Sequence, residues 1–288
     1  MDFLWHLIII FGTWIPSVTT YTLIFGKGKM LHFGPVGVSL FTAYVTILLA
    51  TATGSSVLGL LGGLCGALLL SALFAWLSLR LEADAFGVMS IAVHLGIIAI
   101  ILNWSSLTRG ALGISRIPRA PFPTSLFLFA MVMTVMSILW ILAILAIDRS
   151  SFGRQLSALA EHKWHAMSLG IERVRVHFLA FAIGAFSSVL ATFSYLHYVG
   201  LLHPNDFQFP AFILYVMFVV AGKPGSILGS TLAIILLVLL KEGLRFVPQF
   251  LPISVSVIGP LQLILFGLIL FGAVWWRRDI LFVKQRTI

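Results

Sequence analysis

The chain has 288 residues, of which 60% are hydrophobic and only 9% are charged, and its formal net charge is +9. A soluble domain of this length needs far more surface charge, so the composition excludes a soluble globular protein. The positive balance does not indicate a nucleic-acid partner, because the basic residues cluster beside apolar runs, where they orient a membrane protein and meet anionic lipid head groups.

Apolar runs long enough to cross a bilayer, about 20 residues each, recur along the whole chain. The predicted spans are 3–25, 34–50, 55–79, 86–102, 125–147, 178–199, 209–222, 226–240 and 260–276. We therefore predict an all-α polytopic membrane protein with about nine membrane segments, forming a single transmembrane domain over residues 1–288. Segments 34–50 and 209–222 are short and contain or adjoin Pro and Gly, so we expect two broken or short helices there.

The longest polar interval is 148–177, which carries five basic residues: Arg149, Arg154, Lys163, Arg173 and Arg175. Basic residues accumulate in cytoplasmic loops, so we place this interval in the cytoplasm. The basic C-terminal tail, Lys27, Lys29 and Arg80 then also lie inside, whereas the N-terminus and the 103–124 loop lie outside. Arg109, Arg116 and Arg119 in that outer loop run against the rule, but a long folded loop can carry such charge.

A helix is predicted in the middle of the polar interval. Ala160, Trp164, Met167 and Ile171 follow one another at helical spacing and would share one face. Gly170 is placed to end or turn that helix. A short amphipathic helix between two spans suits docking to a soluble partner. A helix lying on the lipid surface fits the same pattern.

Two similar stretches follow the two short segments. Residues 53–59 read TGSSVLG and residues 221–229 read AGKPGSILG, and the two short segments run in opposite directions. Paired, interrupted segments of opposite direction indicate an inverted repeat with a transport path between its halves. The alternative is that both are ordinary packing helices, in which glycine permits close helix contact.

The sequence carries no evident catalytic, cofactor or metal site. The stretch 26–29, GKGK, lacks the spacing of a phosphate-binding loop, so we do not expect the chain to hydrolyse ATP by itself. His162 and His165 are spaced to share a metal but have no third ligand nearby. Cys65 is the single cysteine and cannot form an internal disulfide.

Ionisable residues within the spans are few. His94 lies in the middle of a span and His197 near the end of one, and such residues are candidates for a transport path. The alternative for both residues is a neutral histidine that is hydrogen-bonded within the helix packing. Lys241, Glu242 and Arg245 sit at the end of a span and are interpreted as an interfacial cap rather than a site.

One motif resembles a known family. Residues 103–118, NWSSLTRGALGISRIP, look like the outer-loop signature NW-x-SLT-x-G-x-x-GI-x-x-IP of LivM-type permeases of branched-chain amino-acid ABC importers. Further matches follow in the family's order over nearly the whole chain: Gly34, Ala43, Tyr44, Glu161, Ala166, Gly170, Ile171, Ala180, Phe181, Pro204, Phe207, Gly222, Gly225, Ser226 and Gly229.

The resemblance implies a non-catalytic membrane subunit with a coupling helix at about 156–170. It further implies a second permease subunit, cytoplasmic ATP-binding subunits, an extracytoplasmic solute-binding protein and a bacterial or archaeal inner membrane with the C-terminus inside. The residues expected at the docking surface are Glu161, Trp164, Ala166, Met167, Gly170 and Ile171. The residues expected along the translocation path are Gly34, Tyr44, His94, Gly222, Gly225 and Ser226.

The sequence also departs from the family pattern. Lys163 stands where the family often has an acidic residue and His165 where it has a small one, while other positions carry larger residues in place of glycine: Thr42, Ser188, Thr192 and Lys223. Larger side chains at such positions widen helix spacing. The solute therefore stays open between a branched-chain amino acid and a related small polar solute.

Two other classes of function compete with a permease subunit. A stand-alone secondary transporter or channel would need ion-coupling carboxylates inside the spans, and only Glu82 and Asp84 lie near a span's inner end. A membrane-embedded enzyme would need histidines and acidic residues clustered at one depth, and the sequence offers only scattered ones.

Overall fold

A computed structural model describes residues 2–115, 117, 125–250 and 254–276. Within these ranges nine helices are long and apolar enough to cross a membrane, which confirms the predicted all-α polytopic fold. The long helices are α1 (Asp2–Gly26), α2 (Gly34–Thr53), α3 (Ser56–Arg80), α4 (Ala83–Asn103), α6 (Leu126–Arg149), α9 (Arg173–Val199), α10 (Phe209–Ala221), α11 (Ile227–Gly243) and α13 (Val255–Trp276).

Short elements occupy the connections between these helices. They are α5 (Ser105–Thr108), η1 (Gly110–Leu112), β1 (Ile114–Ser115), α7 (Ser151–Glu161), α8 (Lys163–Ser168), β2 (Leu201–Leu202), η2 (Pro204–Phe207), η3 (Leu244–Phe246) and α12 (Val247–Phe250). β1 and β2 pair antiparallel, with Ile114 opposite Leu202, so the connection after α4 is tied to the connection after α9.

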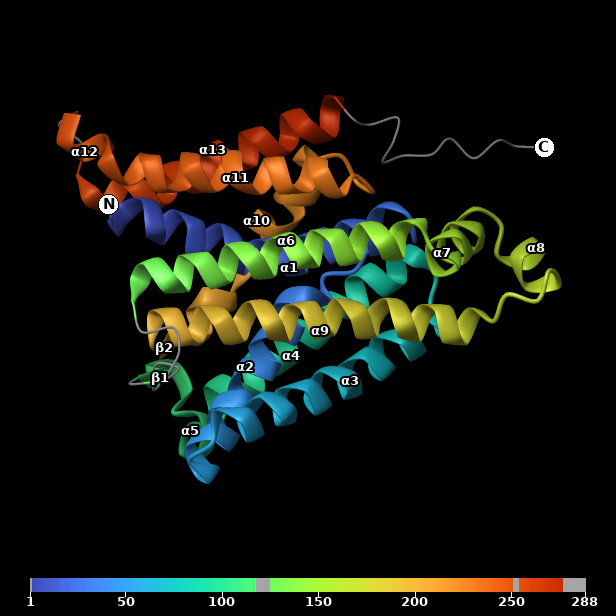
Figure 1. Cartoon of the computed structure of the whole chain (residues 1–288), viewed down its shortest axis with the longest axis horizontal. Coiled ribbons are helices and arrows are strands. Elements are labelled where there is room, and N and C mark those ends of the chain that lie inside the picture. Colours follow the sequence, from blue (N-terminus) through green and yellow to red (C-terminus); the bar gives the residue numbers. More distant parts are fainter. Residues whose placement is uncertain (1, 116, 118–124, 251–253, 277–288) are drawn as a thin grey trace.

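The long helices run back and forth between two ends of the bundle (Figure 1). One end, called here the α7–α8 end, carries α7, α8, the α1–α2 and α3–α4 connections and the α10–α11 turn. The other, called here the opposite end, carries the N-terminal end of α1, the α2–α3 turn, α5, the two strands, η2 and α12. α1 lies at the centre and packs against α6, α9, α10 and α11, while α2 packs against α3, α4 and α9.

The prediction of a broken helix over 34–50 is wrong. α2 is a continuous helix of 20 residues, Gly34–Thr53. Pro35 lies in its first turn, where a missing backbone N–H costs no helical hydrogen bond and the fixed φ of proline favours the helix. The second short segment is confirmed, because α10 has only 13 residues.

The two turns that look alike in the sequence are also capped alike. Gly54 adopts φ +69° and Gly225 adopts φ +84°, which are left-handed conformations that favour glycine. The serine after each glycine is the N-cap of the next helix: the Ser55 hydroxyl accepts from the N–H of Leu58, and the Ser226 hydroxyl accepts from the N–H of Gly229. The turns lie at opposite ends of the bundle, as an inverted pair requires (Figure 1).

The end of α1 lies in backbone contact with the α10–α11 turn. A Cβ atom on Gly26 would lie 1.8 Å from the Gly225 nitrogen, so no side chain fits at position 26. The Gly225 N–H donates to the Thr22 carbonyl oxygen at 3.1 Å. This bond joins the first and last thirds of the chain.

Candidate functional site

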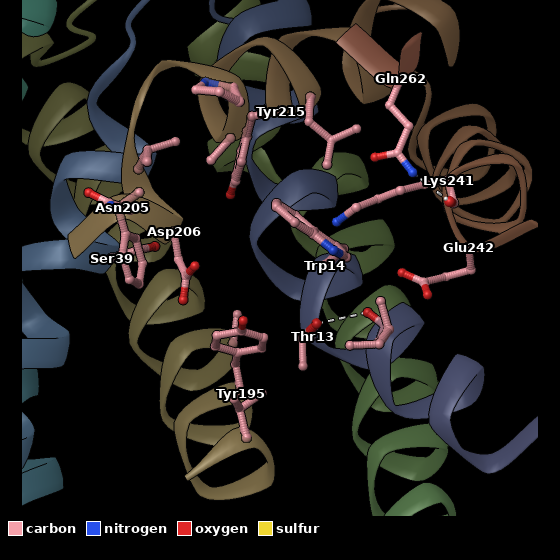
Figure 2. A pocket seen from close by; sticks show the side chains of 18 of the residues that line it. Thr13, Trp14, Ser39, Tyr195, Asn205, Asp206, Tyr215, Lys241, Glu242 and Gln262 are labelled. Carbon is pink, nitrogen blue, oxygen red and sulfur yellow. Dashed lines mark hydrogen bonds between the residues drawn. The ribbon is translucent and has the colours of Figure 1, made fainter. Parts of the chain in front are cut away.

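A cavity with a volume of about 750 Å³ lies in the half of the bundle nearer the opposite end. Its walls come from α1, α2, α9, η2, α10, α11, η3 and α13 (Figure 2). The polar residues on its walls are His6, Thr13, Ser17, Ser39, Thr192, Tyr195, Tyr198, Asn205, Asp206, Tyr215, Lys241, Glu242, Arg245 and Gln262. Ligand pockets commonly have such a size and such a mixture of apolar walls and a few polar groups.

Helical spacing explains why residues far apart in the sequence reach the same space. His6, Ile10, Thr13 and Ser17 are four, three and four residues apart on α1, so they form one stripe toward the cavity. α9 presents the stripe that contains Tyr195 in the same way. The cavity is therefore built by one face of each surrounding helix and not by a local motif.

The charged residues of the cavity fall into a paired and an unpaired set. Glu242 is buried, and one of its carboxylate oxygens lies 2.7 Å from Arg245 Nη1, while His6 Nε2 lies 3.9 Å from the same oxygen. Among the described residues, Asp206 and Lys241 form no ion pair within 4.0 Å. The interpretation of 241, 242 and 245 as a cap rather than a site is therefore incomplete, because all three line the cavity.

Between the cavity and the α7–α8 end the bundle is closed by aromatic rings. Trp14 packs on Tyr215 with ring centroids 5.9 Å apart, and Tyr215 packs on Tyr21 at 5.6 Å. Tyr21 then lies 5.2 Å from the ring of His32, which lies 5.0 Å from that of Phe181. The void enclosed among these rings measures only about 20 Å³, so the rings leave little space between them.

His32 is held in the α1–α2 connection by this aromatic packing. Its backbone carbonyl accepts a hydrogen bond from the Tyr21 hydroxyl at 2.6 Å, and its Nδ1 accepts from the Gly34 N–H at 3.3 Å. Burial lowers the pKa of the imidazole to about 3, because the charged form would lose its hydration. His32 is therefore a neutral structural histidine at neutral pH.

The predicted docking helix is two helices. α7 ends at Glu161 and α8 begins at Lys163, because His162 adopts φ −144° and ψ 86° and interrupts the helix. The prediction of one face shared by residues 160, 164, 167 and 171 is therefore wrong. No glycine or proline marks the break. The expected end at Gly170 is confirmed, because this residue adopts φ +84° after α8.

Most of the docking residues lie on the surface of this loop. Trp164 is 72% exposed and Met167 is 43% exposed, and α8 projects beyond the ends of the spans (Figure 1). Glu161 and Gly170 are exposed and Ile171 is half-buried. Ala166 is buried and so anchors α8 rather than contributing surface. α7 rests on the bundle through Leu156 and Leu159, which are both buried.

An ion pair joins this loop to the rest of the bundle. Lys27 Nζ, just after α1, lies 2.5 Å from a carboxylate oxygen of Asp148, near the end of α6. Lys27 also donates to the Asp148 carbonyl oxygen at 3.3 Å. The start of the α7–α8 loop is thereby fixed to the end of α1, which also contacts Gly225.

Comparison with known families decides what kind of protein has this architecture. The family described as branched-chain amino acid transport system / permease component matches residues 7–274. The chain belongs to this family. The match includes every helix that lines the cavity and the whole α7–α8 loop of this permease.

Individual relatives agree with the family match. The permease is 26% identical over 217 residues to the high-affinity branched-chain amino acid transport system permease protein LivM of Salmonella typhimurium, covering 65% of this chain and 50% of that protein. The LivM protein of Escherichia coli gives the same figures. LivH of Salmonella typhimurium is 26% identical over 240 residues, covering 73% of this chain and 76% of that protein. No solved structure matches the chain significantly.

The chain spans about half the length of the LivM relatives it matches. The residues predicted along the path of this permease do not line the large cavity. Gly34 packs against Phe74, and Gly37 packs against the buried His94, whose Nδ1 would lie 3.1 Å from a Cβ there. Their place in a translocation path stays a prediction.

The remaining path residues have packing roles that the structure describes. Tyr44 is buried on α2, and Gly222 is in close contact with the backbone of Ser230, where a Cβ would lie 2.5 Å from the Ser230 Cα. Gly225 and Ser226 form the turn against α1 described above. These contacts explain why small residues occur there, and they leave a further role in transport open.

Sequence reasoning missed most of the cavity. Trp14, Tyr195 and Gln262 were not selected, because each lies in a mainly apolar stretch and gains its cavity neighbours only in three dimensions. Asn205 was not selected although it lies in the polar stretch 203–206. The signal available was the isolated charge of Asp206 just before a short apolar helix. No group of three or more potential metal ligands gathers among the described residues.

Proposed function

We propose that this permease is a membrane subunit of an ATP-driven importer that carries a branched-chain amino acid or a related small solute across the inner membrane. The observation that carries the proposal is the family match over residues 7–274, joined to a loop whose exposed Trp164 stands outside the spans. Its partners would be cytoplasmic ATP-binding subunits, a second permease subunit and an extracytoplasmic solute-binding protein. The apolar outer faces of its helices would meet lipid.

The distribution of basic residues supports an orientation with the α7–α8 end in the cytoplasm. The described lysines and arginines of that end are Lys27, Lys29, Arg80, Arg149, Arg154, Lys163, Arg173, Arg175 and Lys223. Those of the opposite end are Arg109, Lys241 and Arg245. Cytoplasmic loops carry the excess of positive charge, so the cavity faces outward and α13 leads toward a cytoplasmic C-terminus.

The mechanism we propose is alternating access driven through the α7–α8 loop. The conformation described here has its cavity toward the outside and is closed by the aromatic rings around Tyr21 and His32, as an importer requires before it takes up solute. Movement of α8 by an ATP-binding subunit would reach the bundle through buried Leu156 and Leu159 and through the Lys27–Asp148 pair. Opening the aromatic closure would then release the solute inward.

Replacing Trp164 with Asp tests the docking of the loop. The purified partners and this chain would be reconstituted in vesicles, with solute uptake and ATP hydrolysis measured in the same preparation. A large exposed aromatic residue at an interface often dominates its affinity, so we expect uptake to fall about tenfold or more. Uptake per ATP hydrolysed should fall as well, because the ATP-binding subunit would no longer hold α8.

Ser151→Asp is the matched control, since it adds the same charge to the same loop at the first residue of α7, where a carboxylate suits the helix dipole. It should leave uptake unchanged. Equal uptake by Trp164→Asp and wild type would refute docking at α8. Uphill transport by this chain alone, driven by an ion gradient without any ATP-binding subunit, would refute the whole proposal.

A further inference from the structure

We propose that the large cavity is a binding site for a zwitterionic amino acid with an apolar side chain, with the ligand's ammonium group at Asp206 and its carboxylate at Lys241. This assignment rests on the transport function proposed above, because it names the chemistry by which the membrane subunit itself recognises the solute.

The two charges are available to a ligand. Glu242 already has a cationic partner, because Arg245 Nη1 lies 2.7 Å from one of its carboxylate oxygens. Asp206 and Lys241 line the same cavity, and within the part of the chain that the structure describes neither has an ion-pair partner closer than 4.0 Å. A carboxylate and an ammonium that do not reach each other are both satisfied at once by a molecule that carries the two opposite charges.

The geometry holds these two groups apart. Asp206 lies in η2 and Lys241 near the end of α11, and Figure 2 shows them on different walls, with Trp14 between them in this view. The Asp206 N–H donates to the His203 carbonyl at 3.1 Å, which fixes the η2 turn. The Gln262 side chain donates to the Lys241 carbonyl at 3.0 Å, which fixes the end of α11 against α13.

The remaining surface between the charges suits an apolar side chain. Trp14 is braced by Tyr215 and by Phe218, with ring centroids 5.9 and 5.3 Å away. Leu214 and Leu263 add aliphatic wall. Apolar walls with a few charged groups fit a zwitterion with a hydrocarbon side chain better than a sugar, whose many hydroxyl groups would lack partners.

Binding of radiolabelled leucine to the permease and ATP-binding subunits in nanodiscs, without nucleotide and without the solute-binding protein, tests the assignment. The variants are Asp206→Asn and Lys241→Gln, and the competitors are leucinamide, which lacks the carboxylate, and 4-methylpentanoate, which lacks the ammonium. Each variant should weaken leucine binding by about tenfold or more, the usual effect of losing a charged hydrogen-bond partner. Asp206→Asn should leave the inhibition constant of 4-methylpentanoate unchanged. Lys241→Gln should leave the inhibition constant of leucinamide unchanged.

Arg109→Gln is the matched control, because it removes a charge at the same end of the bundle from a residue outside the cavity. It should bind all three molecules as wild type does. Leucine affinity within about twofold of wild type in both cavity variants, or an equal loss for all three molecules, would overturn the site. If ATP-driven leucine uptake persists in that case, the proposed transport function stands although the binding site at Asp206 and Lys241 is refuted. If the wild-type transporter neither binds nor imports leucine, the proposed function itself is refuted for this solute.

Discussion

The ammonium of Lys27 and the carboxylate of Asp148 meet at 2.5 Å, although 121 residues separate them in the chain. Lys27 follows the central helix α1, and Asp148 lies near the end of α6, just before α7 and α8. The contact therefore lies where the buried middle of the bundle meets its most exposed segment. A displacement of α7 and α8 would therefore act directly on the end of α1 through this ion pair.

Lys27→Ala should lower the free energy of unfolding by about 1 kcal/mol, because the pair is only partly buried and solvent screens part of its attraction. Thermal unfolding in detergent of Lys27→Ala, Asp148→Ala and the double variant gives the coupling between the two residues. Lys29→Ala in the same connection is the control and should leave the unfolding temperature unchanged. Strictly additive losses in the double variant would contradict a direct interaction.

Gly26→Ala should destabilise the fold by several kcal/mol, because the added methyl would lie 1.8 Å from the Gly225 nitrogen and the backbones must separate. The matched control is Gly96→Ala on α4, where a Cβ meets nothing within 4 Å and alanine favours the helix. Yield of folded protein and unfolding temperature are the measurements. Equal behaviour of the two variants would show that α1 and the turn do not approach as closely as described.

His32 should make the fold sensitive to acid. Burial lowers its pKa to about 3, whereas an unfolded histidine titrates near 6.5, so below that pH the unfolded chain binds a proton that the native chain excludes. Stability is then fully present above about pH 6.5 and falls as the pH drops toward 3, with a loss of about 2 kcal/mol by pH 5.

His32→Asn removes this titration and keeps an acceptor for the Gly34 N–H. The variant loses ring packing, so it should be less stable at pH 7, but its unfolding temperature should fall less between pH 7 and pH 5. The quantity to compare is that difference between wild type and variant, because other buried histidines contribute to both. Identical pH dependence in the two proteins would argue against a buried neutral His32.

Phe181→Ala should remove the main ring that packs on His32 and cost about 3–5 kcal/mol, as large-to-small changes at buried aromatic positions do. Phe186→Ala on the same helix is the control, since that ring is 45% exposed and should cost much less. Unfolding temperature in detergent measures both. Leakage of small solutes through vesicles that contain only Phe181→Ala would further show that the aromatic cluster closes the path.

Composition and apolar periodicity were sufficient to predict the architecture. The nine candidate spans of the described ranges, their approximate bounds and the polar loop follow from run length and from the position of basic residues, since both reflect local contact with lipid and water. The failure at 34–50 has a local cause: Pro35 was interpreted as a break, but a proline in the first turn begins a helix.

The cavity lay beyond sequence reasoning because its parts are distant and individually ordinary. Thr13 and Tyr195 are common helix residues, and only the packing of α1 against α9 brings them to one space. Lys241 was interpreted from its place at a span's end, which is correct, but the direction of its side chain depends on where α13 lies. The break at His162 is likewise invisible, because no residue there disfavours a helix strongly.

The two-residue ladder between β1 and β2 has a mechanical consequence. Ile114 pairs with Leu202, and at Gly113 a Cβ would lie 2.4 Å from the Leu202 carbonyl oxygen. The two connections are therefore in close backbone contact. Asp206 follows only four residues after Leu202. If the solute-binding protein proposed above docks on the first connection, its force would pass from β1 through β2 to η2, and docking would then be coupled to a change in the acidic wall of the cavity.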